Sequence, residues 1–183
     1  MSQAFAVWLT GLPASGKTSI AGELSARLAE AGAMVEVLES DALRRVLTPT
    51  ATYSSEERDL FYRALAFYGS RLVAHGVPVI FDATANRRRY RDFARELIPN
   101  FLEVAVVCPL EICQQRDQKG TYRKGREGRT STVPGLQEPY EEPRTPEIVV
   151  NTMTVQPAAA ATTIIQSLQT HGYLRDRANS SDT

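Results

Sequence analysis

The sequence predicts an α/β fold in which a five-stranded parallel sheet is flanked by helices. Short apolar runs alternate with segments of helical periodicity, which is the pattern of parallel strands joined by helices. A glycine-rich loop separates the first apolar run from the first helical segment. A long basic stretch in the second half has little apolar content, so we expect it to lie outside the core.

Five short apolar segments are the expected strands. The first ends at the glycine-rich loop, and the second alternates between apolar and polar residues. The expected strands are Ala4–Leu9, Met34–Glu39, Pro78–Phe81 with Asp82 at its end, Phe101–Val107 and Glu147–Val150. Ligands of such sheets bind beyond the carboxyl ends of the strands, so the residues that follow each strand are the ones to inspect for function.

Four segments have the features of helices. The first carries Ile20, Leu24 and Leu28 at helical spacing and ends at Gly32. The second begins with a capping-box pattern, in which a serine precedes a glutamate by three residues. In this second helix, Ser54 and Glu57 form the capping box, and Phe61, Leu65, Tyr68 and Leu72 are expected to form one apolar face. The third expected helix is arginine-rich and covers Asn86–Leu97. The last expected helix runs from Pro157 to Gly172.

The composition is close to that of an average globular domain. Hydrophobic residues make up 43% and charged residues 23%, and 21 basic residues balance 21 acidic ones. We therefore expect neither nucleic acid nor a membrane as partner. No apolar stretch spans a bilayer and no secretory signal is visible, so we expect a cytoplasmic protein. Cys108 and Cys113 are expected to be buried thiols in a reducing compartment.

The glycine-rich loop reads Gly11-x-x-x-x-Gly16-Lys17-Thr18, the phosphate-binding loop of nucleoside triphosphatases. Backbone N–H groups of such a loop wrap around phosphate oxygens, and the following helix adds the positive end of its dipole. Lys17 is expected to contact the outer phosphates and Thr18 to bind Mg²⁺, so the fold is predicted to be the P-loop nucleoside triphosphate hydrolase fold. The expected ATP-binding residues of the loop are Gly11, Leu12, Pro13, Ala14, Ser15, Gly16, Lys17, Thr18 and Ser19.

Two acidic residues follow expected strands. Asp41 follows the second strand, where a carboxylate can accept a proton from an attacking hydroxyl, and Arg44 lies one turn further on. Asp82 ends the third strand, where it is a further candidate for binding Mg²⁺. Each carboxylate has a structural alternative, because aspartate also caps helix N-termini.

The basic stretch from Arg116 to Arg129 is interpreted as a lid. Its lysines and arginines alternate with glycines, and closure of such a segment neutralises phosphates and excludes water. A solvated loop is the structural alternative, and RNA binding is a further one that the zero net charge disfavours. We expect a single domain over residues 1–174, with the lid at about 114–143 and a disordered polar tail over 175–183.

Four stretches together carry a family resemblance. "GLPASGKTS", "ESDALRR", "VCPLEICQQRDQKGTYRKGREG" and "VPGLQEPYEEPRTPEIVVNT" resemble the adenylylsulfate kinase family in order and content, from about Phe5 to Thr152. This resemblance implies phosphorylation of the ribose 3′-hydroxyl of adenylylsulfate with ATP and Mg²⁺, which gives 3′-phosphoadenylylsulfate in sulfate activation. It also implies that a homodimer is a candidate assembly, because similar kinases are commonly dimers.

The resemblance implies roles for individual residues. Asp41 takes the place of the base near the accepting hydroxyl, with Lys17 as the second catalytic residue, and Arg116 is implied on the ATP side. Tyr53 keeps a stacking position. The implied acceptor-binding residues are Asp41, Arg44, Tyr53, Arg58, Arg63, Lys119 and Lys124.

The chain departs from the family pattern on the acceptor side. Phe61 stands where the family has Asn, Ala64 replaces the second arginine of a pair, and Asp82-Ala83-Thr84-Ala85-Asn86 replaces Ile-Ser-Pro-aromatic. That last stretch is closer to the Asp-x-Thr-Asn of other small-molecule kinases. Two alternatives therefore stay open: a P-loop kinase of another hydroxylated substrate, and a nucleotide-binding module that transfers nothing.

Overall fold

The computed structural model describes residues 4–174, which form a five-stranded, all-parallel sheet in the order β2-β3-β1-β4-β5. The strands are β1 (Ala6–Thr10), β2 (Glu36–Glu39), β3 (Val79–Asp82), β4 (Phe101–Val107) and β5 (Ile148–Asn151). The helices are α1 (Lys17–Glu30), α2 (Ser40–Leu47), α3 (Ser55–Ala74), α4 (Arg88–Leu97), α5 (Leu110–Gln115), α6 (Thr121–Arg126) and α7 (Pro157–Thr170).

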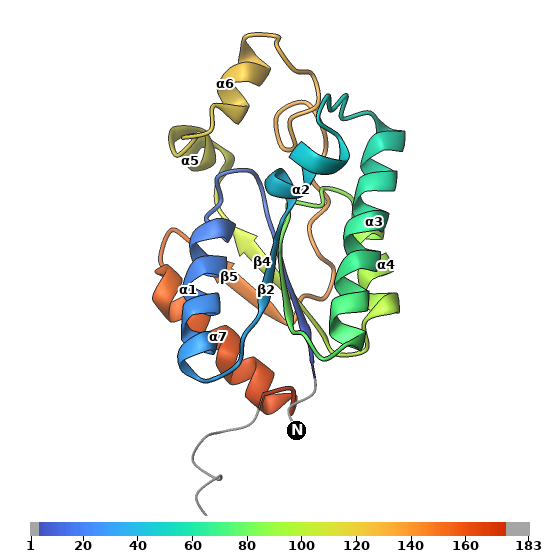
Figure 1. The fold of residues 1–183 in the computed structure, drawn as a ribbon. Helices are drawn as coiled ribbons and strands as arrows, with labels where there is room; N and C mark the ends of the chain where they lie inside the picture. Colours follow the sequence, from blue (N-terminus) through green and yellow to red (C-terminus); the bar gives the residue numbers. More distant parts are fainter. Residues whose placement is uncertain (1–3, 175–183) are drawn as a thin grey trace, which may run out of the picture.

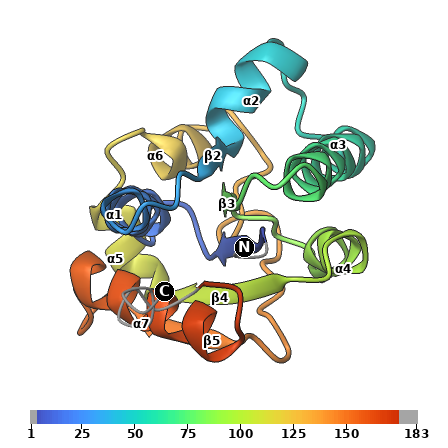
Figure 2. The same ribbon diagram turned by 60° about the horizontal axis from the view of Figure 1, so that its bottom comes forward.

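Helices cover both faces of the sheet (Figures 1 and 2). On one face α1 packs with α7 over a core that includes Leu24, Leu102 and Ile164. On the other face α3 packs with α4 over a core that includes Trp8 and Phe81. Both faces of the central strands are therefore apolar, as a parallel sheet between helical layers requires. The predicted α/β class, strand number and parallel pairing are confirmed.

The predicted strands differ from the observed ones only at their ends. The fourth, Phe101–Val107, is confirmed residue for residue, and β5 is shifted by one residue. The second was predicted from Met34 but begins at Glu36, where the backbone N–H bonds to the Pro78 carbonyl. Apolar pattern alone does not show where that pairing starts.

One predicted helix face is wrong at Tyr68, which is half exposed on α3. The buried face runs instead through Phe61, Leu65 and Gly69. Gly69 lies against the Phe81 ring so closely that a Cβ would be 2.2 Å from it. The helix therefore meets the sheet through a glycine, which hydrophobic periodicity does not detect.

The basic stretch folds more extensively than predicted. We expected no core element there, but α6 buries Tyr122 in a small apolar cluster with Cys108, Cys113 and Val133. The Tyr122 hydroxyl donates a hydrogen bond to the Pro13 carbonyl at 3.0 Å, which joins this segment to the glycine loop. A few well-placed apolar side chains are enough to hold a mostly charged segment. Both cysteines are buried and free, as predicted.

The predicted tail over 175–183 lies outside the described residues. None of the helices within 4–174 is long and apolar enough to cross a membrane.

Candidate active site

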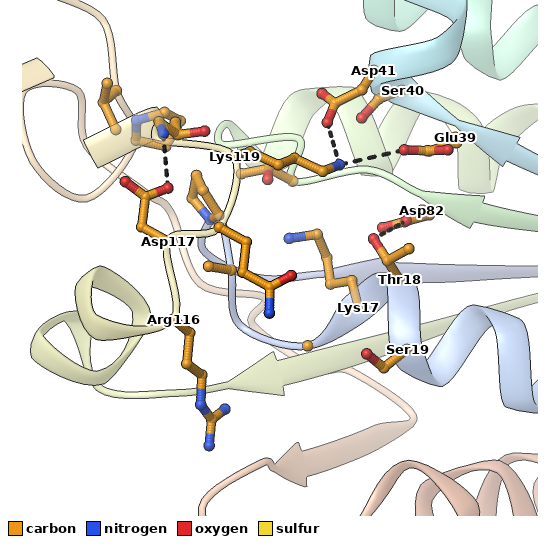
Figure 3. Close-up of a pocket in the computed structure, with 18 of the residues that line it drawn as sticks. Lys17, Thr18, Ser19, Glu39, Ser40, Asp41, Asp82, Arg116, Asp117 and Lys119 are labelled. Carbon is orange, nitrogen blue, oxygen red and sulfur yellow. Dashed lines mark hydrogen bonds and ion pairs between the residues drawn. The ribbon is translucent and has the colours of Figure 1, made fainter. Parts of the chain in front are cut away.

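A cavity of about 830 Å³ lies beyond the carboxyl ends of the strands. Its walls come from the glycine loop, α2, the start of α3, the end of β3 and the basic segment, which are far apart in sequence (Figure 3). This is the position at which parallel α/β sheets bind ligands. The predicted residues that line it are Pro13, Ala14, Gly16, Lys17, Thr18, Ser19, Asp41, Arg44, Tyr53, Arg58, Asp82, Arg116, Lys119 and Lys124.

The glycine loop owes its shape to close backbone packing. A Cβ on Gly11 would lie 2.3 Å from the Val106 carbonyl oxygen, so only glycine fits there. Lys17 is folded back over the loop, and its Nζ donates to the carbonyls of Gly11 at 3.0 Å and Leu12 at 2.8 Å. Burial lowers the Lys17 pKa to about 8, although the negative charge of Asp82 acts to raise it. The ammonium is therefore held at the loop without a directly bonded carboxylate among the described residues.

Gly11, Leu12 and Ser15 form the frame of the loop rather than the cavity wall. Ser15 is fully buried, and its Oγ is the one buried side-chain N or O atom within residues 4–174 that has no hydrogen-bond partner. A buried hydroxyl without a hydrogen-bond partner is energetically costly.

Thr18 and Asp82 meet at the base of the cavity. The Thr18 hydroxyl donates to Asp82 Oδ2 at 2.6 Å, which joins the start of α1 to the end of β3 (Figure 3). Burial raises the pKa of Asp82, while Lys17 and the Thr18 hydrogen bond oppose that rise. A hydroxyl and a carboxylate are the hard oxygen ligands that Mg²⁺ prefers, and few protein ligands suffice for an ion that keeps waters and phosphates.

Asp41 lies in the first turn of α2 and does not cap the helix. The N-cap position belongs to Glu39, and no side chain caps that end. Asp41 Oδ2 instead accepts a hydrogen bond from Lys119 Nζ at 2.7 Å, and Glu39 lies 3.4 Å from the same ammonium (Figure 3). The basic segment therefore reaches across the cavity to the candidate base. The capping alternative for Asp41 is not supported.

Arg44 is held in a sandwich of aromatic rings. Its guanidinium carbon lies 3.8 Å from the ring centre of Phe61 and 4.8 Å from that of Tyr53. Glu57 accepts a hydrogen bond from Arg44 Nη1 at 3.2 Å. Phe61, a departure from the family pattern, is thus a platform for a predicted acceptor-binding arginine.

Glu57 also shapes the turn that carries Tyr53. Its carboxylate accepts the backbone N–H of Thr52 at 2.6 Å and that of Tyr53 at 3.2 Å. Tyr53 has a φ of 55°, a left-handed conformation that a non-glycine residue rarely adopts. Burial disfavours the charged form of Glu57, but the hydrogen bonds from Thr52 and Tyr53 and the charge of Arg44 lower its pKa overall. The capping box was predicted correctly at Ser54, which accepts from the Glu57 N–H, but the reach of Glu57 to this turn was missed.

Arg58 joins three parts of the cavity wall. Its guanidinium donates to the Tyr53 carbonyl at 3.1 Å, to Asn86 Oδ1 at 3.4 Å and to the Thr132 carbonyl at 2.5 Å. Asn86 is buried and donates in turn to the Pro139 carbonyl at 3.1 Å. The stretch that departs from the family pattern therefore fastens the end of the basic segment to β3.

The opposite end of the cavity was only partly predicted. Arg116 donates to Thr152 Oγ1 at 3.2 Å and to the Thr152 carbonyl at 3.3 Å. The cavity is also lined by Thr152, Val155, Gln156 and Pro157, for which no sequence pattern predicted a functional role. Their position after β5 is the signal that could have identified them, since the same strand-end rule applies.

Arg63 is not brought to the cavity. It is exposed on α3, and its guanidinium lies 5.4 Å from the ring centre of Phe93 on α4. Arg58 and Arg63 are five residues apart, which places them about 140° from each other around the helix axis, so their side chains leave the helix on different sides. Lys124 lines the cavity but is exposed at its mouth.

These features define a P-loop kinase: a strand, glycine loop and helix that present Lys17 and Thr18, an acid at the end of the neighbouring strand, and a carboxylate across the cavity. The family model for adenylylsulphate kinase matches residues 3–151. The chain belongs to the adenylylsulfate kinase family.

Individual relatives agree with this family. The adenylyl-sulfate kinase of Synechococcus sp. (strain JA-3-3Ab) is 40% identical over 169 residues, which cover 92% of this chain and 96% of the relative. The solved structure of the Mycobacterium tuberculosis APS kinase CysC in complex with AMPPNP and APS is 30% identical, with a TM-score of 0.86 over 92% of this chain and 99% of the other. A hexameric APS kinase from Thiobacillus denitrificans is 28% identical, with a TM-score of 0.71 over 95% of this chain and 30% of the other.

Proposed function

We propose that this chain transfers the γ-phosphoryl group of ATP to the 3′-hydroxyl of adenylylsulfate, giving ADP and 3′-phosphoadenylylsulfate. The observation that carries the proposal is a cavity in which the phosphate-binding loop faces a carboxylate and a wall of arginine and aromatic side chains. Membership of the adenylylsulfate kinase family supports the assignment of these two walls as the donor and acceptor sides of that reaction.

The donor side is formed by the glycine loop and Arg116. Backbone N–H groups and the N-terminus of α1 suit the phosphates, and Lys17 supplies a positive charge to the transferring group. Arg116 and the residues from Thr152 to Pro157 form the end of the cavity that suits the rest of the nucleotide. Lys17 must leave the Gly11 and Leu12 carbonyls to reach a phosphate, so nucleotide binding replaces two neutral partners with a charged one.

Thr18 and Asp82 are the residues that would hold Mg²⁺. The ion, when bound with ATP, neutralises charge on the outer phosphates. Asp82 lies 2.6 Å from the Thr18 hydroxyl and is buried, which keeps its carboxylate fixed at the base of the cavity.

The acceptor side is formed by Asp41, Arg44, Tyr53 and Arg58, with Lys119 and Lys124 from the basic segment. Asp41 accepts the proton of the attacking hydroxyl as the new O–P bond forms and the bond to the leaving ADP breaks. Lys119 holds this carboxylate in place at 2.7 Å. Two buried guanidinium groups, Arg44 and Arg58, suit an anionic acceptor because they form directed hydrogen bonds to its oxygens.

We further propose that residues 114–143 act as a lid within one domain over 1–174, that the protein works in the cytoplasm, and that it self-associates. The contacts of Tyr122 with Pro13 and of Lys119 with Asp41 support the lid, because they connect this segment to both sides of the cavity. The hexameric assembly named for the Thiobacillus denitrificans kinase supports self-association, and a homodimer is the smallest assembly of this kind.

The test is an acceptor panel with γ-labelled ATP and Mg²⁺. Adenylylsulfate, adenosine monophosphate, adenosine and several sugar alcohols serve as acceptors, and the labelled product is identified by chromatography. We expect label on adenylylsulfate and a strong preference over adenosine monophosphate, which lacks the sulfate. Label on another alcohol but none on millimolar adenylylsulfate would overturn the proposed acceptor and leave the donor site standing.

A further inference from the structure

Two side chains of opposite charge are buried together between α4 and β4, outside the cavity. Arg91 of α4 is 1% exposed and Glu103 of β4 is 6% exposed, and Arg91 Nε donates to Glu103 Oε1 at 2.6 Å. Neither residue lines the cavity. A buried ion pair adds little net stability compared with well-packed apolar residues, because both charges must be removed from water. Stability alone therefore does not account for this pair.

Arg91 donates hydrogen bonds from all three of its guanidinium nitrogens. Besides the bond from Nε, Nη1 donates to the Ala85 carbonyl between β3 and α4, and Nη2 donates to the Glu141 carbonyl at 2.7 Å near the end of the proposed lid. The Glu141 N–H donates in turn to the Asn86 carbonyl at 2.8 Å. These bonds form a closed ring through Arg91, Ala85, Asn86 and Glu141, and the planar fork of a guanidinium is suited to complete it.

Ala85 is held in a conformation that is unusual for its residue type. Its φ is 44°, in the left-handed region that a non-glycine residue rarely adopts. Its N–H donates to the Tyr62 hydroxyl of α3 at 3.1 Å, while its carbonyl accepts from Arg91 of α4. Such a conformation persists only where the surrounding structure fixes it. Here the two backbone polar groups of Ala85 are fixed by side chains from two different helices.

The conformation of Ala85 sets the direction of the next residue, Asn86. Asn86 is buried, and its side chain accepts from Arg58 Nη1 at 3.4 Å and donates to the Pro139 carbonyl at 3.1 Å. Arg58 is one of the two buried arginines that line the proposed acceptor side. The ring of hydrogen bonds around Arg91 is therefore connected to an arginine of the cavity wall, although Arg91 itself does not reach the cavity.

We propose that Arg91 is a positioning residue of the acceptor side. It fixes the carbonyls of Ala85 and Glu141, these fix Asn86, and Asn86 orients the Arg58 guanidinium towards the acceptor. Glu103 balances the buried charge of Arg91 and holds its guanidinium in place. The inference rests on the proposed function for its effect on turnover, whereas the ring of hydrogen bonds is independent of which alcohol is phosphorylated.

Steady-state kinetics with a matched control test this role. Arg91→Met/Glu103→Leu removes both charges together, because Arg91→Met alone would leave Glu103 buried without this partner. We expect it to raise KM for adenylylsulfate about tenfold, while kcat and the Kd for ATP stay within about twofold. Arg95→Met is the control, since Arg95 lies on the same helix and its guanidinium bonds to Glu103 and Glu147 instead. A fall in kcat with unchanged KM, which a merely structural role would give, or an equal rise of KM in Arg95→Met would overturn the proposal.

A double-mutant cycle tests whether Arg91 acts through Asn86. We expect Asn86→Ala to raise KM for adenylylsulfate by about the same factor, about tenfold. Adding Arg91→Met/Glu103→Leu to Asn86→Ala should then change KM by less than about twofold, because the path to Arg58 is already broken. Independent effects, which would multiply to about a hundredfold in the combined variant, would contradict this path.

Amide hydrogen exchange tests the ring without any acceptor. The N–H groups of Ala85 and Glu141 are bonded within this network, so we expect both to exchange roughly tenfold faster in Arg91→Met/Glu103→Leu than in the wild type or Arg95→Met. Unchanged protection of the β1 N–H groups shows that the fold is intact. A wild-type protein that does not phosphorylate adenylylsulfate would refute the proposed function alone, because exchange still decides whether Arg91 fixes this stretch. Unchanged exchange of both N–H groups would overturn the positioning role.

Discussion

The donor and acceptor sides of the cavity are built in different ways. The centre of the donor side depends on backbone: close packing of Gly11 against Val106 sets the loop, and Lys17 and Thr18, which follow it directly, add side chains. The acceptor side depends on side chains from α2, α3, β3 and the lid, linked through Glu57 and Arg58. A backbone site tolerates little change in sequence, whereas a side-chain network can be rebuilt with other residues. This explains why the departures from the family pattern fall on the acceptor side.

The largest effect is expected from Lys17→Ala. Lys17 supplies charge to the transferring phosphoryl group, and such electrostatic interactions contribute several kcal/mol, so we expect kcat to fall at least ~10³-fold. Circular dichroism checks the fold, and a coupled assay for ADP measures turnover. Near-normal turnover of the folded variant would remove the donor assignment.

A smaller loss is expected from Asp41→Asn. The change keeps the shape and removes the proton acceptor, so kcat should fall about 10²-fold while the Kd for ATP stays within about twofold. Glu39→Gln is the matched control, because Glu39 also contacts Lys119 but is not assigned to the hydroxyl. If Asp41→Asn turns over like Glu39→Gln, the base is elsewhere and Asp82 becomes the next candidate.

Arg58→Ala tests whether the acceptor side of the cavity can be weakened without weakening ATP binding on the donor side. Loss of its hydrogen bonds to Tyr53 and Thr132 should raise KM for adenylylsulfate at least tenfold with little change in the Kd for ATP. Arg63→Ala removes the same residue type from the same helix outside the cavity, so we expect its kinetics to match the wild type. Equal damage to ATP binding and acceptor KM by Arg58→Ala would show that the two sides are not separable.

The smallest effect concerns pH on the donor side. Burial lowers the Lys17 pKa to about 8. The free protein therefore loses the positive charge of Lys17 as the pH rises through that value. ATP affinity should therefore be nearly constant below pH 7 and fall by at most about tenfold between pH 7 and pH 9, with about fivefold of that fall between pH 8 and pH 9. Calorimetric titration measures it, and Lys17→Arg, which stays charged, should remove this pH dependence. An unchanged dependence in that variant would assign it to another group.

The difference between the two sides also explains what could be predicted. The fold and the glycine loop could be predicted from local patterns, namely apolar periodicity and a motif of fixed spacing. The rule that ligands bind beyond the carboxyl ends of parallel strands predicted that Lys17, Thr18, Asp41 and Asp82 share one site. The acceptor network depends on contacts between residues distant in sequence. Arg58 meets Thr132 across 74 positions, and no periodicity encodes that contact.

Arg63 and Phe61 show that matching or departing from the family pattern does not by itself decide whether a residue belongs to the site. Arg63 matches a family position but faces α4, because its place on the helix decides its direction. Phe61 departs from the family position, but it lies 3.8 Å from the Arg44 guanidinium and helps to hold it. Residue identity at a motif position therefore indicates a role only when the packing around it is known.

³¹P NMR of the reaction products shows whether both sides of this cavity act on one phosphoryl group. Purified protein is incubated with equal amounts of Mg-ATP and adenylylsulfate, and the spectrum is followed to completion. We predict that a 3′-phosphomonoester resonance grows in step with ADP, with inorganic phosphate near the level of a control without protein. ADP accompanied by an equal amount of inorganic phosphate and no phosphomonoester would contradict the account, because it would mean that water, and not the bound hydroxyl, accepts the phosphoryl group.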